Sequence, residues 1–342
     1  ARAVIGVRNL KIITFGPRPQ DFFACNAPIK GLYELGVEIE ENSELDLLVA
    51  YKEHENDPRI PEVCADMAKE MGEGRYYADL SERMAQFELT LLDWAEAHKG
   101  ARKYVAFADK CWPAFPSQFG FEPCYVNSRL AARGIPVSCE VDIYGALSEY
   151  IGLCISNDAV TLLDINNSVP QYIYDEDIKG KYDYKLTDTF MGFHCGNTPA
   201  CKMCDSRAVK YQLIQHRLLE PEGSEPDFTR GTLEGDIAAS DITFYRLQCN
   251  SEGELVSYVA EGEVLDVPTR SFGGIGIFAI KEMGRFYRHV LIEKNYPHHG
   301  AVAFGHFGKA LFEVFKYIGV PVEEIGYNQP KGVRYPTENP WG

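Results

Sequence analysis

The stretch from residue 135 to residue 166 reads IPVSCEVDIYGALSEYIGLCISNDAVTLLDIN, and its pattern decides the fold class. Residues 135–142 are apolar and β-branched, residues 143–155 have the length and spacing of a buried helix, and residues 159–166 form a second apolar run. A strand, a helix and a second strand in this order are typical of a unit with two parallel strands. This stretch therefore predicts an α/β domain.

The same alternation extends toward the N-terminus. A helix expected within residues 120–133 ends before Gly134, as helices commonly do at glycine. Further elements are expected at residues 8–16 (strand), 21–35 (helix), 60–98 (amphipathic and helical) and 104–109 (strand). We predict a doubly wound parallel sheet of the flavodoxin or Rossmann type over residues 1–160.

The pattern changes after about residue 165. Short β-branched and aromatic runs separated by turn residues replace the alternation; they lie at residues 181–194, 231–249, 254–267 and 274–280. Such runs favour antiparallel strands in a sandwich or barrel. One late helix is expected at residues 307–319, with Leu311 and Phe315 on its apolar face. Residues 161–342 are therefore predicted to form a β-rich, barrel-like domain.

Composition excludes several classes of protein. The 342 residues are 45% hydrophobic, which allows sizeable cores, and the net charge of -16 argues against binding to nucleic acid or to an anionic membrane. No run approaches the roughly 18 apolar residues of a transmembrane helix. The 10 cysteines are sparse and lie mostly in apolar runs, which favours reduced thiols in a cytoplasmic protein. The N-terminus has neither Met nor a signal sequence and is expected to be a cut within a longer chain.

Two acidic residues lie near the ends of the apolar runs. Glu140 follows VSC in residues 135–142, and Asp164 follows TLL in residues 159–166. Ligands of open parallel sheets bind beyond the carboxyl ends of the strands, so we expect both carboxylates in one crevice. A charge in apolar surroundings is costly, and a divalent cation would relieve that cost. The alternative is that both residues are solvated acids or helix caps; capping is the role we favour for Asp142.

Histidines form a second candidate site. His298, His299 and His306 lie within PHHGAVAFGHF, beside glycines that let a ligand approach the backbone. Imidazole combined with carboxylates suits Mn, Fe or Co, whereas thiolates suit Zn. We expect His299 to be the metal ligand because an apolar run follows it. His306 is expected to begin the late helix, and each histidine taken alone could be a core or capping residue.

The segment FHCGNTPACKMCDSR (193–207) contains a third candidate site. Its Cys201 and Cys204 have the two-residue gap of a zinc knuckle, but no second pair completes four ligands. A structural zinc involving Cys195 is one interpretation. We favour a loop at the domain junction in which Asn197 faces a pocket.

Three segments taken together resemble the L-fucose isomerase family, within the fucose and arabinose isomerase group. They are SCEVDIYGALSEYIG (138–152), LLDIN (162–166) and HHGAVAFGHFGKALFEVFKYIGV (298–320). The resemblance runs from about residue 100 to residue 320 and implies that Glu140, Asp164 and His299 ligate the catalytic metal. It further implies that family members carry an additional N-terminal domain, which this chain is expected to lack.

The resemblance implies a function. It indicates an aldose–ketose isomerase for a pentose or 6-deoxyhexose, dependent on Mn²⁺ or another divalent cation, in which Glu140 or Asp164 transfers the proton. Trimers or hexamers are expected, with a monosaccharide as the other partner. The residues expected to bind the sugar are Phe193, His194, Asn197, His298, Trp112 and Gln118. The alternatives are a non-catalytic sugar-binding or regulatory module on the same fold and a zinc-stabilised structural protein.

Overall fold

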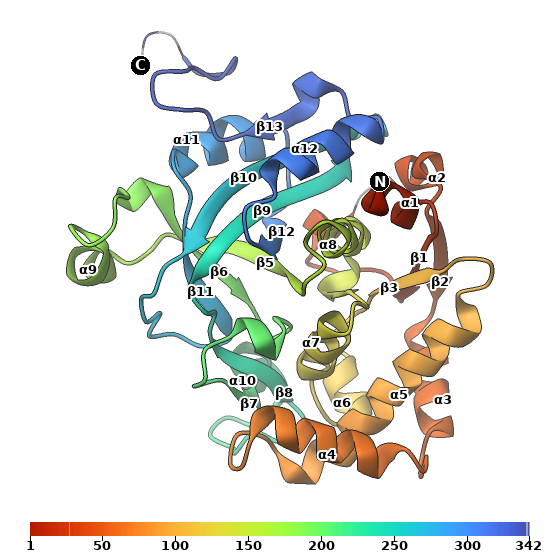
Figure 1. Ribbon diagram of the computed structural model, residues 1–342. Helices are drawn as coiled ribbons and strands as arrows, with labels where there is room; N and C mark the ends of the chain where they lie inside the picture. The colour runs from red at the N-terminus through yellow and green to blue at the C-terminus, as the bar shows by residue number, and fades with distance from the viewer. Residues whose placement is uncertain (27, 340, 342) are drawn as a thin grey trace.

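The computed structural model describes residues 1–26, 28–339 and 341, and it contains two β-sheets with a helix between them (Figure 1). The first sheet is parallel and has the strand order β2-β1-β3-β4. Its strands are β1 (Leu10–Phe15), β2 (Glu38–Asn42), β3 (Tyr104–Ala108) and β4 (Val137–Ser138). The predicted parallel α/β sheet is confirmed.

Eight helices accompany this sheet in the described part of the chain. They are α1 (Arg2–Val7), α2 (Lys30–Leu35), α3 (Glu44–Glu53), α4 (Ile60–Met71), α5 (Ser81–His98), α6 (Phe115–Phe119), α7 (Cys124–Ala132) and α8 (Ile143–Ser156). The helix predicted at 21–35 is wrong for its first half, which contains only a 3₁₀ turn at Phe23–Cys25. Pro28 lacks a backbone N–H, so a helix cannot run through it unbroken.

The second sheet closes into an antiparallel barrel. The strands follow the order β10-β9-β12-β5-β6-β11, and β11 pairs again with β10. These six strands are β5 (Val160–Asn167), β6 (Thr189–His194), β9 (Ser240–Cys249), β10 (Leu255–Val264), β11 (Gly274–Ala279) and β12 (His299–Phe304). The predicted barrel-like fold is confirmed, and closure leaves these strands without a free edge.

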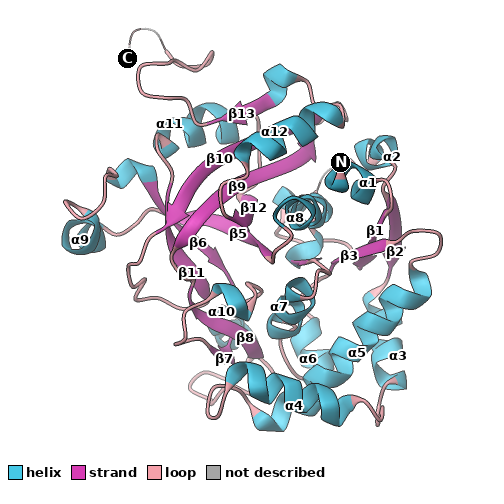
Figure 2. Ribbon diagram, in the orientation of Figure 1, coloured by secondary structure: helices cyan, strands magenta, loops and turns pink. Residues whose placement is uncertain are grey.

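Smaller elements extend the barrel (Figure 2). Strands β7 (Ala208–Tyr211) and β8 (Arg230–Asp236) continue the sheet beyond β11, and β13 (Ile325–Tyr327) pairs in parallel with β10. The helices of this half are α9 (Gln171–Ile173), α10 (Leu213–Leu219), α11 (Met283–Phe286) and α12 (Gly308–Tyr317). In the ranges that the structure describes, no helix is both long and apolar enough to cross a membrane.

Strand β5 corrects one sequence-based prediction. Residues 159–166 were expected in the parallel sheet beside residues 135–142, but β5 pairs antiparallel with β12 and β6 in the barrel. The physical reason is that β4 is only two residues long and offers little to pair with, whereas β12 and β6 satisfy both edges of β5. The division into domains near residue 160 stays a prediction.

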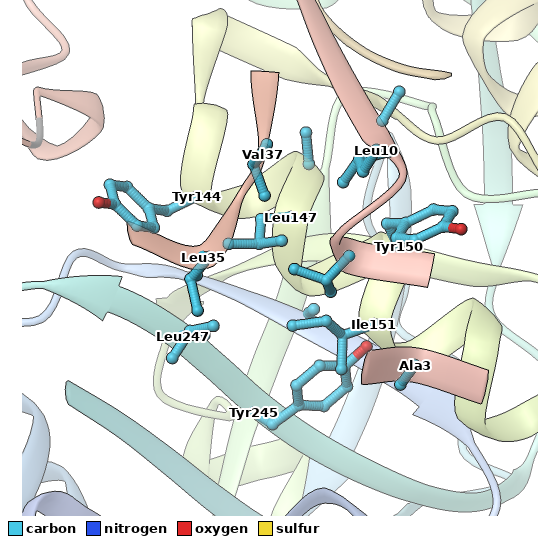
Figure 3. Packing of buried hydrophobic residues seen from close by; sticks show 14 of the residues in the cluster. Ala3, Leu10, Leu35, Val37, Tyr144, Leu147, Tyr150, Ile151, Tyr245 and Leu247 are labelled. Atoms are coloured by element: carbon cyan, nitrogen blue, oxygen red, sulfur yellow. The ribbon is translucent and has the colours of Figure 1, made fainter. Parts of the chain in front are cut away.

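Helix α8 packs against both sheets and joins their cores (Figure 3). Its buried Leu147 and Ile151 lie in one apolar cluster with Leu10 of β1 and Tyr245 of β9. Each such side chain stabilises the fold by about 1.5–3 kcal/mol when fully buried. A side chain at Gly152 would overlap the Tyr245 hydroxyl, so glycine lets α8 approach the barrel this closely.

Candidate active site

Glu140 lies where the chain leaves the parallel sheet. β4 ends at Ser138, and a 3₁₀ turn follows in which Glu140 has φ 61° and Val141 has φ 55°. Both values fall in the left-handed region, which is costly for a β-branched residue such as valine. The Val141 N–H donates to the Asp109 carbonyl at 2.9 Å, which holds the turn against the end of β3. The strained turn places the Glu140 side chain in a buried position.

Asp164 and His299 come from neighbouring barrel strands. They are direct partners in the register between β5 and β12, so their side chains lie on the same face of the sheet. By strand alternation this face also carries Val160 and Ala301, which belong to the cluster around α8. Both site residues therefore lie on the outer wall of the barrel, toward the parallel sheet.

Three donor atoms converge at this junction. His299 Nε2 lies 3.1 Å from Glu140 Oε2 and 3.2 Å from Asp164 Oδ1. All three atoms are buried, and none has an aligned hydrogen-bond partner among the described residues. Buried polar atoms are normally paired, so two carboxylate oxygens and one imidazole nitrogen that lie close together without such partners indicate a missing positive ligand. Two carboxylate oxygens and one imidazole nitrogen form a donor set that fits a divalent cation.

A carboxylate orients the histidine from behind. Asp142 Oδ2 lies 2.8 Å from His299 Nδ1, which leaves Nε2 directed at the other two carboxylates. Arg246 of β9 binds both oxygens of Asp142, at 2.8 and 2.9 Å, and its Nε donates to Gln248 Oε1 at 2.9 Å. Such a carboxylate behind a histidine is typical of metal sites.

The same carboxylate also begins α8. Asp142 Oδ1 accepts a hydrogen bond from the Gly145 N–H at 2.8 Å, so the capping role predicted from the sequence is confirmed. Burial alone would raise the pKa of Asp142, but the charge of Arg246 and the contact with His299 hold it well below its usual value. Asp142 is therefore ionised and orients the imidazole with a full negative charge.

The charge balance of the site shows what a metal would replace. Burial opposes a charge on His299, but its contacts with Asp142, Asp164, Cys25 and Glu140 raise its pKa well above the usual value. In a site without a metal, a proton on Nε2 would therefore balance the negative charge of the carboxylates. A metal ion would take the place of that proton, because a ligating imidazole is neutral.

Two thiols lie close to Glu140. Cys111 and Cys139 are buried, with their sulfur atoms 3.1 Å apart, and together with Glu140 they have spacing that could hold a metal. The contact with Cys111 and burial raise the pKa of Cys139 well above its usual value. A thiol ligates a metal as thiolate, so this pair is a weak competitor for the ion.

Two further histidines border the site. The His298 ring lies 4.6 Å from that of His299, and its Nε2 is 3.7 Å from Asp164 Oδ1. Burial lowers the pKa of His298, although the Asp164 charge opposes that shift. His194 ends β6, is buried, and has its ring centre 5.9 Å from that of His299. Both were predicted to bind the sugar, and that role stays a prediction.

The remaining predicted sugar-binding residues lie at different distances from this centre. Trp112 contacts Phe22 (ring centres 5.8 Å apart), which in turn lies 6.3 Å from the His298 ring. Asn197 is buried with an unpaired Oδ1. Phe193 packs on Phe272 in a separate apolar cluster, although it is the register partner of Asp164 between β6 and β5. Gln118 is exposed on α6.

Four residues around the candidate site were not predicted from the sequence. Cys25, whose sulfur lies 3.7 Å from His299 Nδ1, and Phe22 come from a loop with no recognisable motif. The role of Asp142 behind His299 was missed as well. Arg246 had a usable signal, because a charged residue within the apolar strand run 242–249 needs a buried carboxylate partner.

The cysteines of the third candidate segment lie apart from any metal geometry. Cys201 is exposed, Cys204 is half-buried, and Cys195 accepts a hydrogen bond from Gln212 at 3.1 Å. Among the described residues, none of the three belongs to a group spaced to hold a metal ion. The zinc interpretation therefore has no geometric support within that part of the chain.

Comparisons with known proteins agree with this geometry. Residues 192–326 match the model of the L-fucose isomerase C-terminal domain. The chain is 24% identical to a sulfoquinovose isomerase of Alkalicoccus urumqiensis, over 93% of the chain and 66% of that protein. It is 25% identical to a sulfoquinovose isomerase of Priestia megaterium, over 93% of the chain and 65% of that protein.

A sulfoquinovose isomerase of a Clostridium species is likewise 25% identical, over 78% of the chain and 54% of that protein. The chain thus spans somewhat less than two thirds of the length of these relatives. The family predicted from three short segments is confirmed by these matches. Residues 192–326 are thus similar to the L-fucose isomerase C-terminal domain, and the chain as a whole is distantly similar to the sulfoquinovose isomerases.

Proposed function

We propose that this chain is a metal-dependent aldose–ketose isomerase. The observation that carries the proposal is the convergence of three buried, unpaired donor atoms from Glu140, Asp164 and His299. Homology to sugar isomerases supports the same reaction class. A fold without such a site would not support it, because function depends on the site and not on the fold.

Glu140, Asp164 and His299 would hold the ion. The structure spaces these donors as two groups that share His299, one with Cys25 and Glu140 and one with Asp164 and His298. Carboxylate and imidazole donors favour Mn²⁺ over a soft-ligand metal such as Zn²⁺. When bound, the ion would supply Lewis-acid polarisation of the sugar oxygens. Asp142 and Arg246 would keep the imidazole oriented for this role, since both are buried and rigidly hydrogen-bonded.

The carboxylates of the chain would move the proton. Interconversion of an aldose and a ketose removes a proton from C2 and delivers one at C1. Glu140 is buried and Asp164 is half-buried beside the site where the sugar oxygens would bind, and either carboxylate can carry the proton between the two carbons. Phe22, Trp112 and His298 would form a wall that limits access of water.

The substrate class is the part of the proposal that needs the broadest test. The resemblance to fucose isomerases favours a pentose or a 6-deoxyhexose, whereas the relatives that match most of the chain are sulfoquinovose isomerases. Sulfoquinovose therefore belongs in a panel with L-fucose, D-arabinose and L-arabinose. Binding of a sugar without turnover in the presence of Mn²⁺ would instead favour the non-catalytic sugar-binding module.

The first test replaces the ligand that comes from the parallel sheet. Glu140→Gln keeps the volume and removes the charge, so we expect weaker metal binding and isomerase activity lowered by ~10²–10⁴-fold. Metal content and ketose formation are measured on the same samples.

Glu149→Gln is the matched control for that test. Glu149 is another buried acid, and burial together with the Asp142 charge raises its pKa to about 8, so the amide imitates its state at neutral pH. The control should keep metal and activity. Normal turnover by Glu140→Gln with its metal intact would refute the site.

The oligomeric state and the cellular compartment are also proposals. Homology suggests a homo-oligomer, expected as a trimer or hexamer, and exposed Ile5 and Tyr317 line one open hollow that could be covered by a neighbour. All ten cysteines are free, which suits a reducing compartment such as the cytoplasm. Light scattering of the purified chain tests the assembly; a monodisperse monomer at micromolar concentration would count against it.

A further inference from the structure

A pair of buried cysteines beside Glu140 has no role in the proposed reaction. Cys111 and Cys139 are 3% and 1% exposed, and their sulfur atoms lie 3.1 Å apart. Among the described residues, neither sulfur atom has any other hydrogen-bond partner. A Glu140 carboxylate oxygen and both sulfur atoms lie within 4.8 Å of one another. Two thiols and a carboxylate therefore converge on one buried point.

The backbone holds the two thiols in this arrangement. Cys111 lies just beyond the end of β3, and Cys139 directly follows β4, which pairs in parallel with β3. The Asp109 N–H donates to the Ser138 carbonyl at 3.0 Å, and the Val141 N–H donates to the Asp109 carbonyl at 2.9 Å. These two hydrogen bonds lie on either side of Cys139 in the sequence. The positions of both sulfur atoms are therefore fixed by two paired strand ends.

The donor set decides which ion would bind at this point. Two sulfur atoms and one carboxylate oxygen suit a soft cation such as Zn²⁺ or Cd²⁺, whereas oxygen and imidazole donors suit Mn²⁺. Zn²⁺ binds thiolates at about 2.3 Å, so two sulfur ligands of a tetrahedral ion lie about 3.8 Å apart. The sulfur atoms of the metal-free pair are closer than that, at 3.1 Å. Small rotations about χ1 can supply the difference.

We propose that Cys111, Cys139 and Glu140 form a second metal site, which takes a thiophilic divalent cation and thereby inhibits the isomerase. On binding, two S–H bonds break, two metal–sulfur bonds form and both protons leave to solvent, with no change of oxidation state. Glu140 also lies against His299 in the candidate catalytic site, so an ion held by the thiolates competes for the same carboxylate. The inhibitory part of this inference rests on the proposed function, whereas the ion site itself does not.

Cadmium is the probe for this site, because cadmium–thiolate bonds absorb in the ultraviolet and Mn²⁺ bound to oxygen and nitrogen does not. The chain is loaded with Mn²⁺ and titrated with Cd²⁺, and absorbance and ketose formation are followed on the same samples. We expect the absorbance to rise until one Cd²⁺ is bound per chain. Isomerase activity should be lost in parallel with that rise.

Serine variants locate the ion. Cys111→Ser and Cys139→Ser each remove one of the two sulfur ligands, so the absorbance should fall by at least half. Inhibition should then need at least ~10–100-fold more Cd²⁺, which is the loss that even a change behind a ligand causes. Two variants at different positions guard against a folding defect in either one. Cys201→Ser, at an exposed cysteine outside the groups of described residues that are spaced for a metal, is the matched control and should behave like the parent.

Cys25→Ser separates this site from a rival one, because Cys25 is spaced with Glu140 and His299 as a group that could hold a metal. This variant should keep the cadmium absorbance. Loss of the absorbance in Cys25→Ser together with its retention in Cys111→Ser would overturn the assignment. A parent protein that shows no cadmium absorbance would overturn it as well.

The activity measurement decides the inhibitory role separately. Full turnover with Mn²⁺ in a sample that carries the cadmium absorbance would contradict the competition for Glu140. If the parent converts no sugar of the panel with Mn²⁺, the proposed function fails and the inhibitory role fails with it, while the absorbance still decides the ion site.

Discussion

Asp142 combines three contacts on one carboxylate: the cap of α8, the pairing with Arg246 and the orientation of His299. Asp142→Asn separates these roles, because asparagine caps a helix as well as aspartate does but carries no charge. We expect metal affinity to fall ~10–100-fold, since the imidazole loses its orienting carboxylate. The free energy of unfolding should fall by about 3–5 kcal/mol, because Arg246 is left buried without its partner.

A double variant tells the two effects apart. Asp142→Asn combined with Arg246→Met removes the unpaired charge, so stability should largely recover while metal affinity stays low. Urea unfolding and a metal competition titration measure the two quantities, and Asp46→Asn in the exposed cap of α3 serves as control. Recovery of both properties in the double variant would contradict the orienting role.

Glu149 leads to a prediction about pH. Burial and then the Asp142 charge raise its pKa from 4.5 to about 8, so the folded state keeps a proton that the unfolded state releases. The contribution of Glu149 to stability is therefore present below about pH 4.5 and is lost as pH rises toward about 8, at up to ~1.4 kcal/mol per pH unit. Glu149→Gln should be more stable than the parent by a margin that grows from pH 5 to pH 8. Urea unfolding in chelator checks this; parallel curves for the two proteins would refute it.

Single residues could be predicted where a polar side chain that can ligate a metal lies within an apolar run. Glu140, Asp164 and His299 lie within apolar runs that made a charge or an imidazole conspicuous, and the structure brings the three together. Arg246 and Phe22 were not found, because a contact between distant segments leaves no local periodicity. The candidate metal ligands of a buried site can be recognised in the sequence. The residues that hold them in place can be recognised only once the fold is known.

At the scale of elements, strand β5 shows what local pattern can and cannot predict. Its apolar run correctly predicted a strand, which is realised as Val160–Asn167. The sheet to which it belongs was predicted wrongly, because the sequence of a strand carries no record of its neighbours. Glu140 and Asp164 converge all the same, since α8 carries the chain from the end of the parallel sheet to the wall of the barrel.

Helices α4, α5 and α7 are joined by an ion network. Fully buried Glu88 accepts from Arg129 at 2.6 Å, and Arg129 also contacts Asp66 and Glu70, each at 2.8 Å. Glu88→Gln removes the buried negative charge, so we expect unfolding free energy to fall by about 3–5 kcal/mol with metal content unchanged. Glu313→Gln, in an exposed pair with Lys316, should change the unfolding free energy by less than about 0.5 kcal/mol. A small change in the unfolding free energy of Glu88→Gln, or a loss of metal from that variant, would contradict this separation of structural and functional charges.

At the scale of the whole molecule, the candidate metal site joins the two halves of the fold. Glu140 follows the last parallel strand, whereas Asp164 and His299 belong to the barrel. The apolar cluster around α8 already holds the halves together, and the carboxylates at its edge repel one another unless a positive charge lies between them. A bound cation should therefore stabilise the docking of the halves as well as the site itself.

Removal of the metal should consequently lower the thermal stability of the whole chain. A ligand that binds only the folded state stabilises it by about 2.7 kcal/mol when its concentration is 100 times Kd, and chelation removes that contribution. For a chain of 342 residues we expect Tm to fall by several degrees in chelator and to return on addition of Mn²⁺. Calorimetry should show one transition, because α8 belongs to both cores. Glu140→Gln serves as the control, since a variant that binds the ion more weakly should lose less Tm on chelation. An unchanged Tm in parent protein shown to be stripped of metal would mean that the three donor atoms are satisfied without a cation, and the site would have to be reinterpreted as a protonated cluster around His299.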